Sequence, residues 1–279
     1  QFIPLHYHGQ MLADDQRMSS FREAIEKLVP EGSHVVDLGG GTGALSYFAS
    51  KRARKVTCVE RIPHVAAAAR RLLAANGAYN VTVVEADARL FVPDEPVDVV
   101  LCEMLHVALV REKQVEVLES FKRMHEQKFG IPVGRIIPEA SLLAVQPIHE
   151  PYEFHGFYAP VTRFYPPGAV DAPTIEMGAP EIYATIEYLQ PGIFEFAVDG
   201  TLTCTRDGYV NALRFITKNL IGIFPEEGRS ADWHMQYMSI PLPHPIQMCA
   251  GEELAISFQY TQGASIESLI ASVKAEKQR

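Results

Sequence analysis

Apolar and polar residues alternate along the first half of the chain in a way that predicts helices and strands in turn. Residues 11–29 place their apolar positions on one helical face, and Pro30 with Gly32 ends that helix. Val-rich runs then follow, mostly separated by helical segments, at 35–38, 55–60, 81–86 and 97–103. Near-continuous apolar strands that alternate with helices indicate a parallel sheet buried on both faces.

The pattern changes near Gly130. From residue 136 onward the apolar runs are short and broken by Pro and Gly, which predicts an antiparallel barrel or sandwich. Residues 151–180 hold six prolines and are expected to form an irregular excursion. The predicted division is an N-terminal helical segment, a Rossmann-like domain and a β-barrel-like domain, at 1–30, 31–137 and 138–279.

The composition suits a globular protein, because 47% of the 279 residues are apolar. Neither a run of 18 apolar residues nor an apolar leader segment is found, so we expect no membrane span. The cysteines at 58, 102, 204 and 249 show no metal or disulfide spacing, so we expect reduced thiols in a cytoplasmic protein without a metal site. Because the chain begins with Gln1 rather than Met, we expect residues to precede it.

The formal charge of −9 lies mostly in the second half. Residues 1–140 carry 17 Lys+Arg against 18 Asp+Glu, or −1, and residues 141–279 carry 8 against 16, or −8. An acidic domain disfavours nucleic acid, whose phosphates are bound by Lys and Arg. It is compatible with a cationic substrate, although a solvated acidic surface explains it equally well.

A glycine-rich turn follows the first predicted strand, in the stretch VVDLGGGTGAL. Gly39, Gly41 and Gly43 allow the main chain to approach a ligand closely. Glu60 ends the next strand, where a carboxylate accepts both hydroxyls of a ribose. Asp37 precedes the glycines, and its charge would repel a pyrophosphate but suit the ammonium group of a methionine moiety. The pattern therefore favours S-adenosylmethionine (SAM) over a dinucleotide.

Three more acids follow later strands. Asp87 comes after the third strand, where its carboxylate would accept from an adenine amino group or lie in a solvated turn. Glu103 and Glu112 lie nine residues apart after the fourth strand. On one continuous helix they would face opposite sides, so they act together only if the chain reverses between them. Ligands of such sheets bind at the carboxyl ends of the strands, where all three acids are expected.

Taken with these motifs, the sequence resembles the protein arginine methyltransferases over most of its length. The stretch HGQMLADDQR keeps the spacing of a family segment that folds over the cofactor. By that resemblance His8 and Met11 would lie near the cofactor, and Arg17 would bind its methionine carboxylate. A guanidinium recognises a carboxylate through two parallel hydrogen bonds, which agrees with this role.

The spacing of Glu103 and Glu112 is similar to that of a family loop whose two glutamates clamp the substrate guanidinium. This resemblance implies that the two carboxylates orient one terminal nitrogen toward the methyl group and leave it more nucleophilic. Met104 and His106 lie within the same stretch. We expect them to line the acceptor pocket or to pack beside it.

The stretch ADWHMQ falls where the family has a Thr-His-Trp loop, and it departs from the family there. Trp233 is kept, but Asp232 replaces a histidine that pairs in the family with the acid corresponding to Asp14. Either His234 substitutes after a small shift or the second domain approaches differently. We expect Trp233 and His234 near the substrate. The family dimerises through a helical arm, and the prolines of 151–180 disfavour two helices, so a homodimer is left open.

The sequence is thus identified as a divergent member of this family, with a Rossmann-like SAM-binding domain followed by an antiparallel β-domain. The predicted reaction is methyl transfer from SAM to a guanidinium nitrogen, on an arginine-containing protein or peptide or on a small guanidino compound. Two alternatives remain. One is a SAM-dependent methyltransferase acting on a small molecule or RNA, and the other is a non-catalytic SAM-binding protein.

Overall fold

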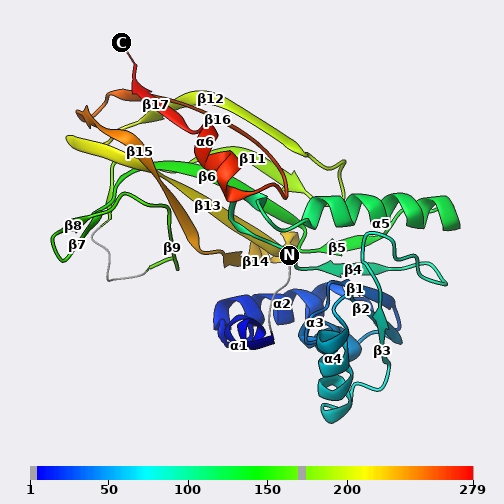
Figure 1. Cartoon of the computed structure of the whole chain (residues 1–279). Coiled ribbons are helices and arrows are strands. Elements are labelled where there is room, and N and C mark those ends of the chain that lie inside the picture. Colours follow the sequence, from blue (N-terminus) through cyan, green and yellow to red (C-terminus); the bar gives the residue numbers. More distant parts are fainter. Residues whose placement is uncertain (1–4, 169–173, 279) are drawn as a thin grey trace.

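A parallel five-stranded sheet forms one half of the molecule in the computed structural model, which describes residues 5–168 and 174–278 (Figure 1). Its strands are β1 His34–Leu38, β2 Lys55–Glu60, β3 Val81–Glu85, β4 Val99–Cys102 and β5 Arg135–Ile137. They lie in the order β3-β2-β1-β4-β5, and each neighbouring pair is parallel. The order in which the chain adds strands to the sheet reverses between β1 and β4, since β2 and β3 follow on one side of β1 and β4 and β5 on the other. Sheets of this kind bind ligands at such a switch point.

The two central strands are buried along their whole length, as the Val-rich runs predicted. Asp37 is an exception to the apolar sequence of β1, because its carboxylate side chain is only 1% exposed. A buried carboxylate costs free energy unless it is compensated, so this residue marks the carboxyl end of β1 as a functional position.

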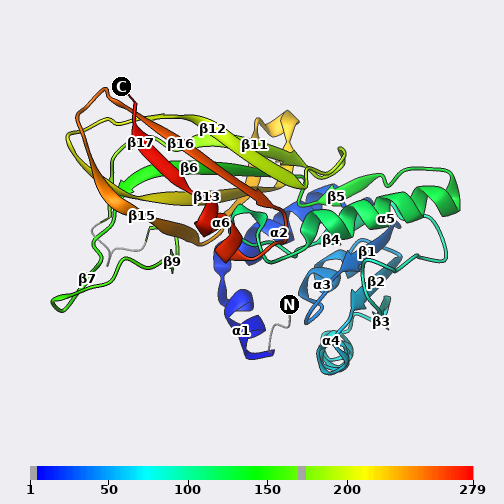
Figure 2. The ribbon, with the colours of Figure 1, turned by 45° about the horizontal axis from the view of Figure 1, so that its top comes forward.

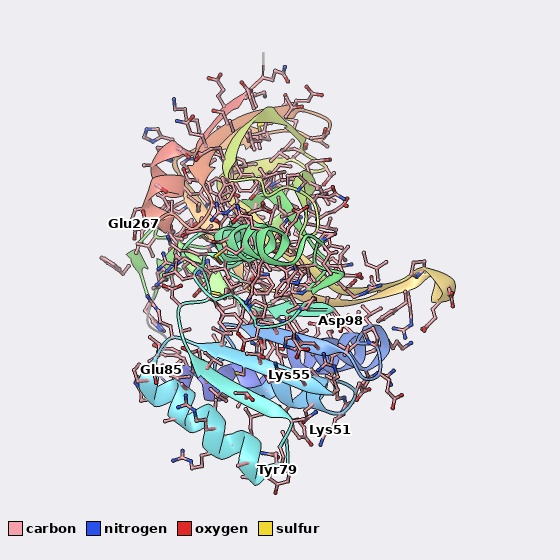
Figure 3. The ribbon with its side chains drawn as sticks, turned by 90° about the vertical axis from the view of Figure 1, so that its right-hand side faces the viewer. Lys51, Lys55, Tyr79, Glu85, Asp98 and Glu267 are labelled. Carbon is pink, nitrogen blue, oxygen red and sulfur yellow. The ribbon has the colours of Figure 1, made fainter. Side chains whose placement is uncertain are left out.

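Helices flank the sheet, namely α3 Ala44–Ser50, α4 Pro63–Ala75 and α5 Gln114–Phe129. In a side view, α5 lies between the parallel sheet and the antiparallel strands (Figure 3). Tyr79, in the α4–β3 turn, marks the end of the molecule opposite to the antiparallel strands (Figure 3). Within the described ranges we find no helix that is long and apolar enough to cross a membrane.

The N-terminal segment contains two helices where one was predicted at 11–29. These are α1 Leu5–Ala13 and α2 Asp15–Leu28, and the break falls at Asp14. Asp14 has extended main-chain angles and accepts a hydrogen bond from the Arg17 N–H at 2.9 Å, so it caps α2. The apolar periodicity runs through the break, and the prediction therefore missed it.

The second half of the chain forms two packed antiparallel sheets. The larger sheet contains β6 Ala140–His149, β9 Arg163–Tyr165, β10 Ile175–Glu176, β11 Glu181–Glu187, β13 Gly208–Phe224, β14 Arg229–His234 and β15 Tyr237–Met248. The smaller contains β12 Glu195–Thr203, β16 Glu253–Thr261 and β17 Lys274–Lys277, which lie above the larger sheet (Figure 2). The antiparallel domain is thus confirmed, and its described strands pack as two sheets rather than as a closed barrel.

Aromatic side chains fill the space between these sheets, where the rings of Tyr183 and Phe258 and of Phe215 and Phe258 lie 5.1 Å apart. Short elements complete the domain, namely the hairpin of β7 Glu153–Phe154 and β8 Phe157–Tyr158, the 3₁₀ turn η2 Pro225–Glu227, and α6 Ile266–Ser272. The predicted excursion at 151–180 holds β7 to β10 and connecting loops, and its residues 169–173 lie outside the described ranges.

Helix α2 joins the two halves of the molecule by packing on β13 and β14. A Cβ at Gly222 would lie 2.8 Å from the Ala24 side chain, so glycine permits this close approach. The Ser20 hydroxyl donates to the Asp232 carbonyl at 2.7 Å, and Arg229 pairs with Glu23 at 2.5 Å. These contacts fix the position of α2, which carries Arg17, relative to the antiparallel domain.

Candidate active site

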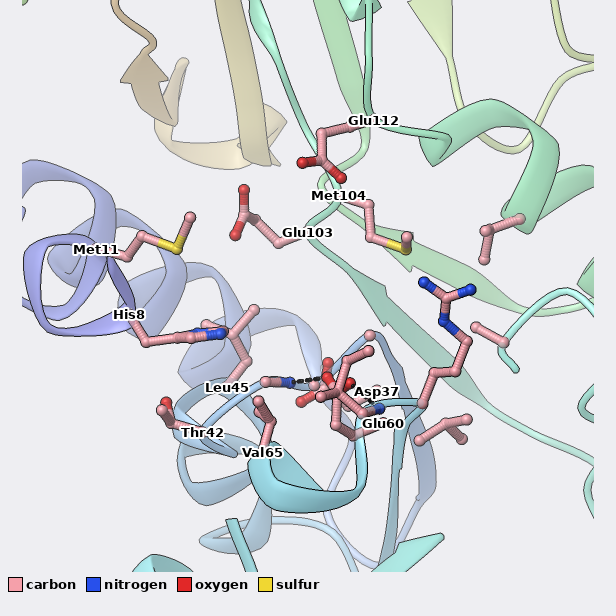
Figure 4. A pocket seen from close by; sticks show the side chains of 18 of the residues that line it. His8, Met11, Asp37, Thr42, Leu45, Glu60, Val65, Glu103, Met104 and Glu112 are labelled. Atoms are coloured by element: carbon pink, nitrogen blue, oxygen red, sulfur yellow. Dashed lines mark hydrogen bonds between the residues drawn. The ribbon is translucent and has the colours of Figure 1, made fainter. Parts of the chain in front are cut away.

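A cleft of about 260 Å³ lies at the carboxyl ends of β1, β2 and β4, bordered by α1 and the loop after β4 (Figure 4). Asp37 and Glu60 lie on one side of it, and Glu103 and Glu112 lie on the other (Figure 4). The cleft brings together many of the predicted site residues: His8, Met11, Arg17, Asp37, Gly39, Gly41, Glu60, Asp87, Glu103, Met104 and Glu112.

The glycine turn between β1 and α3 forms the floor of the cleft. Gly39 and Gly41 have left-handed main-chain angles, with φ of 74° and 56°. A Cβ at Gly41 would lie 2.9 Å from the His8 ring, and one at Gly39 would lie 3.1 Å from the Met104 side chain. Gly43 does not line the cleft, because its Cβ would point at Leu73 of α4 at 2.9 Å.

Asp37 lies beneath this turn. Ser46 donates both its main-chain N–H, at 3.1 Å, and its hydroxyl, at 2.6 Å, to the same carboxylate oxygen. Burial raises the pKa of Asp37 to about 6, in spite of the two hydrogen bonds from Ser46, and the charges of Glu60 and Glu103 add to the effect of burial. A buried carboxylate in this state favours a cationic ligand group beside it.

Glu60 ends β2 and is held by main-chain donors. One of its carboxylate oxygens accepts from the Gly41 N–H at 3.1 Å, and the other accepts from the Ile62 N–H at 2.7 Å. The side chain is 8% exposed and borders the cleft. Its orientation is therefore set by the two turns that follow β1 and β2.

Asp87 lies at the rim of the cleft after β3. Arg89 donates to it through Nε at 3.0 Å, through Nη2 at 2.5 Å and through its main-chain N–H at 3.0 Å. These hydrogen bonds lower the pKa of Asp87 to about 2. Asp87 is therefore ionised at neutral pH and able to accept a further hydrogen bond from a ligand.

The charge of the floor decides which ligand fits it. A pyrophosphate on this turn would meet the carboxylates of Asp37 and Glu60, which repel it. SAM, by contrast, carries an ammonium group and a sulfonium group, and both would be attracted to these carboxylates. The residues present therefore fit SAM rather than a dinucleotide.

Arg17 connects the two sides of the cleft. It is 9% exposed, and its guanidinium forms an ion pair with Glu103 and donates to the Met11 carbonyl at 3.0 Å. The guanidinium carbon lies 5.6 Å from the centre of the Trp233 ring, within range of a cation–π contact. The predicted ligand of Arg17, a methionine carboxylate, would therefore bind beside Glu103.

The chain reverses between Glu103 and Glu112, as a joint action of the two carboxylates would require. The loop contains a single 3₁₀ turn, η1 Val107–Leu109, and Ala108, Leu109 and Arg111 have φ of 56°, 54° and 66°. Such angles cost a non-glycine residue about 1 kcal/mol or more. A segment that keeps three of them must be held by its surroundings.

Residues of the antiparallel domain supply that support. The Ala108 N–H donates to the Thr217 hydroxyl on β13 at 2.8 Å, and the Arg111 N–H donates to the Ala264 carbonyl at 2.8 Å. Burial raises the pKa of Glu112, and the charge of Glu103 adds to this effect. The loop therefore keeps two carboxylates close together at the edge of the cleft, and Arg17 is paired with Glu103.

Comparison with known proteins identifies the family. Residues 35–128 match the family described as a methyltransferase domain. An uncharacterized protein of Methanothermobacter thermautotrophicus is 32% identical over 270 residues, which cover 96% of this chain and 97% of that protein. The matched range contains the glycine turn and the acids of the floor. The chain is a SAM-dependent methyltransferase.

Further relatives are named as arginine methyltransferases. The arginine N(omega)-methyltransferase of Streptomyces achromogenes subsp. streptozoticus is 28% identical over 284 residues, covering 90% of this chain and 74% of that enzyme. The Trypanosoma brucei PRMT1 enzyme–prozyme complex with AdoHcy shares the fold, with a TM-score of 0.74 at 19% identity, over 97% of this chain and 96% of that one. The predicted family is confirmed: this is a divergent class I methyltransferase related to the arginine methyltransferases.

Three residues that we expected near the acceptor of this methyltransferase lie outside the cleft. The His106 ring contacts Phe164 of β9 at 5.9 Å, and burial lowers the pKa of His106. Trp233 donates its indole N–H to Asp14 at 3.0 Å. His234 has a buried Nδ1 without a hydrogen-bond partner, and burial lowers its pKa.

The altered Thr-His-Trp loop therefore contacts the N-terminal segment in another way than through His234. His234 does not replace the family histidine, because Asp14 is bonded to Trp233 instead. The Asp232 carboxylate pairs with Lys218 at 2.6 Å. The contact between the N-terminal segment and the second domain is thus kept with a tryptophan as the donor.

The sequence did not reveal the apolar wall of the cleft, to which Leu45 and Val65 contribute from the first turns of α3 and α4 and Val117 from α5. Their signal was an apolar position in the first turn of a helix that follows a strand of the sheet. In the described part of the methyltransferase, no group of three or more His, Cys, Asp or Glu side chains is arranged to hold a metal ion.

Proposed function

We propose that this methyltransferase transfers a methyl group to a nitrogen of a guanidinium group held between Glu103 and Glu112. The observation that carries the proposal is that both carboxylates line one cleft beside the glycine turn. Burial and the neighbouring charge raise the pKa of Glu112, so a further cation between the two groups is favourable. A guanidinium is a planar cation with several N–H donors, and it suits a pair of carboxylates.

The residues on the other side of the cleft would hold the cofactor. Asp37 would bind its ammonium group and Glu60 its ribose hydroxyls, while Asp87 would accept from the adenine amino group. Gly39 and Gly41 would let the ligand lie directly on the main chain, since they have no side chain to block it. Glu103 and Glu112, on the other side of the cleft, would then be left for the acceptor.

The N-terminal segment would complete that binding. Arg17 would bind the cofactor carboxylate while it keeps its ion pair with Glu103, and His8 and Met11 would cover the cofactor from α1. Arg17 would then orient Glu103 and the cofactor together. SAM supplies an activated methyl group, which the acceptor nitrogen attacks as the bond from carbon to sulfur breaks.

The two glutamates would act mainly by positioning. Held by both carboxylates, the guanidinium presents one terminal nitrogen to the methyl carbon, and its positive charge is drawn toward the other nitrogens. Glu112 is also suited to accept the proton that this nitrogen loses, because its pKa is raised above the ordinary value of a glutamate. Met104 would narrow the space between the cofactor and the acceptor, since it contacts Gly39 and lines the cleft.

The acceptor is either an arginine in a protein or peptide or a small guanidino compound. A relative that matches 90% of this chain is named for methylating arginine, which supports the guanidinium chemistry. The charge of −8 on residues 141–279 disfavours RNA. The enzyme would act in the cytoplasm, where its four free thiols stay reduced. Its assembly as a homodimer is a separate proposal to be tested.

The test uses wild-type protein and SAM labelled on the methyl group. The protein and labelled SAM are incubated with matched panels of arginine peptides, lysine peptides, free guanidino compounds and RNA. The labelled products are identified by mass spectrometry. Label on a guanidinium nitrogen supports the proposal. Label on lysine or RNA alone, or SAM binding without transfer to any acceptor, contradicts it.

A further inference from the structure

Gln114 is a buried amide at the base of the loop that carries the two glutamates. It is 0% exposed and begins α5, two residues after Glu112. Its Nε2 donates to the Cys102 carbonyl at 2.6 Å, and its Oε1 accepts from the Met104 N–H at 2.8 Å. One side chain therefore bonds the main chain immediately before and immediately after Glu103.

These two hydrogen bonds replace the pair that a neighbouring strand would make with the end of β4. Strand β4 ends at Cys102, and Glu103 is the first residue beyond it, so no neighbouring strand fixes its main chain. The Gln114 carboxamide supplies the acceptor and the donor that such a strand would provide. Because Gln114 follows Glu112 in the chain, the same contact ties the two ends of the loop to each other.

The far end of the loop is held from the other domain. Gln262 donates through Nε2 to the Glu112 carbonyl at 2.9 Å, and it is 6% exposed. Gly263 lies against the same stretch, since a Cβ there would meet the Glu112 carbonyl oxygen at 3.3 Å, and its φ of +71° favours glycine. Glu112 is thus placed by a turn of the antiparallel domain, whereas Glu103 is placed by Gln114.

We propose that Gln114 is a positioning residue that sets the separation and the orientation of Glu103 and Glu112, and so the geometry in which the acceptor nitrogen meets the methyl group. This inference rests on the proposed function of the two glutamates. The side chain touches neither ligand, because it does not line the cleft. It acts through the main chain on both sides of Glu103, where a displacement of about 1 Å reduces turnover by roughly 100-fold.

A glutamine at this position also has a structural explanation, in which its hydrogen bonds only stabilise the fold. The chain offers a matched case of that kind in Asn211, which is 6% exposed. Its Oδ1 accepts from the Glu150 N–H at 2.7 Å, and its Nδ2 donates to the Glu150 carbonyl at 2.9 Å. Asn211 therefore also makes one accepted and one donated bond to main chain, here to Glu150 itself, within the antiparallel domain and away from the cleft.

The experiment compares Gln114→Met with Asn211→Leu, because each keeps the size of the side chain and removes one accepted and one donated hydrogen bond. Both variants are assayed with SAM and the guanidinium acceptor of the wild-type enzyme, and SAM affinity and thermal unfolding are measured alongside. For Gln114→Met we expect kcat to fall by roughly 10- to 100-fold, with SAM affinity within about threefold of wild type. For Asn211→Leu we expect a lower Tm and wild-type kcat.

A second variant covers the case in which Gln114→Met does not fold. Gln262→Met removes a single bond to the Glu112 carbonyl, and we expect it to reduce kcat while it leaves SAM affinity unchanged. The positioning role is overturned if Gln114→Met keeps wild-type kcat and KM, or if Asn211→Leu loses kcat to the same extent. A wild-type protein that methylates no guanidinium compound would overturn the proposed function and this inference together, so the two failures are distinguishable.

Discussion

The two sides of the cleft hold their carboxylates in different ways. Asp37 and Glu60 end neighbouring strands of one sheet, and their hydrogen bonds come from Ser46, Gly41 and Ile62 in the turns and helix that directly follow those strands. Glu103 and Glu112 lie on a loop with three non-glycine residues at positive φ. That loop is held by side chains and main-chain groups from α2, β13 and the turn after β16.

This difference teaches that the two functions have different structural requirements. The cofactor side is built within a short stretch of the Rossmann-like domain, so it depends on local sequence. The loop of the proposed acceptor side depends in addition on contacts from the N-terminal helices and the antiparallel domain. Changes on the acceptor side should therefore remove turnover without removing SAM binding, and changes on the cofactor side should weaken binding itself.

The largest effect is expected for Glu103→Gln. The variant loses one of the two charges that hold the guanidinium, and we expect turnover to fall by roughly 1,000-fold, which corresponds to about 4 kcal/mol. SAM affinity should change less than turnover, because Glu103 reaches the cofactor side only through its ion pair with Arg17. Turnover is measured with labelled SAM at saturating acceptor. If the variant keeps a tenth of wild-type turnover, the two-glutamate clamp is wrong.

Arg17→Ala tests the residue that connects both sides. We expect SAM binding to weaken by about 2 kcal/mol, because a charge-assisted contact to the cofactor carboxylate is lost. The matched control is Arg22→Ala, which removes an exposed arginine of the same helix and should change SAM binding little. Isothermal titration with SAM measures both. Equal affinities for the two variants would refute the carboxylate-binding role of Arg17.

Asp37→Asn tests the buried carboxylate. The pKa of Asp37 is raised to about 6 in the folded protein, above its ordinary value, so ionised Asp37 destabilises the ligand-free fold as pH rises through about 6. The variant removes that cost, which amounts to up to about 3 kcal/mol at neutral pH and vanishes below about pH 4.

We therefore expect the Tm difference between Asp37→Asn and wild type to become more positive as pH rises from about 4 to about 7. The same variant should bind SAM more weakly, by roughly 10-fold or more, because it cannot offer a charge to the ammonium group. Thermal unfolding at several pH values and a SAM titration measure the two effects. A Tm difference that is independent of pH would show that Asp37 is not the titrating group.

The smallest effect is expected for Trp233→Phe. It removes the indole hydrogen bond to Asp14 and weakens the aromatic contact with Arg17. We expect a loss of about 1 kcal/mol in folding free energy, the contribution of one hydrogen bond, and only a small change in SAM affinity. Denaturant unfolding and a SAM titration check this. A loss of SAM binding as large as that of Arg17→Ala would mean that Trp233 is part of the cofactor site.

The same comparison explains what could be predicted from the sequence. Short local patterns predict the parallel sheet, the glycine turn and the acids at the carboxyl ends of β1 and β2. Each of these features is formed by one continuous stretch of the sequence. The resemblance of the Glu103–Glu112 spacing to the family loop implied a pair, and both residues line one cleft. The sheet, the glycine turn and the acids of β1 and β2 need no knowledge of how the domains are packed.

Features that depend on packing between domains could not be predicted. Asp14 accepts hydrogen bonds from the Arg17 N–H and the Trp233 indole N–H, and these set the break between α1 and α2. The apolar periodicity continues through the break and so does not predict it. His234 was expected near the substrate, yet it lies on β14, which pairs with β13, and its Nδ1 is buried. The pairing of Arg17 with Glu103 joins residues 86 positions apart, which no spacing within the sequence reveals.

The most direct measurement of the separation between the two sides uses Glu112→Gln, because Glu112 is not the partner of Arg17. SAM affinity and methyl transfer to the same guanidinium acceptor are measured on one preparation, beside wild type. We predict SAM affinity within about threefold and turnover reduced by at least about 100-fold. Loss of SAM binding, or turnover close to wild type, would contradict the assignment of Glu112 to the acceptor.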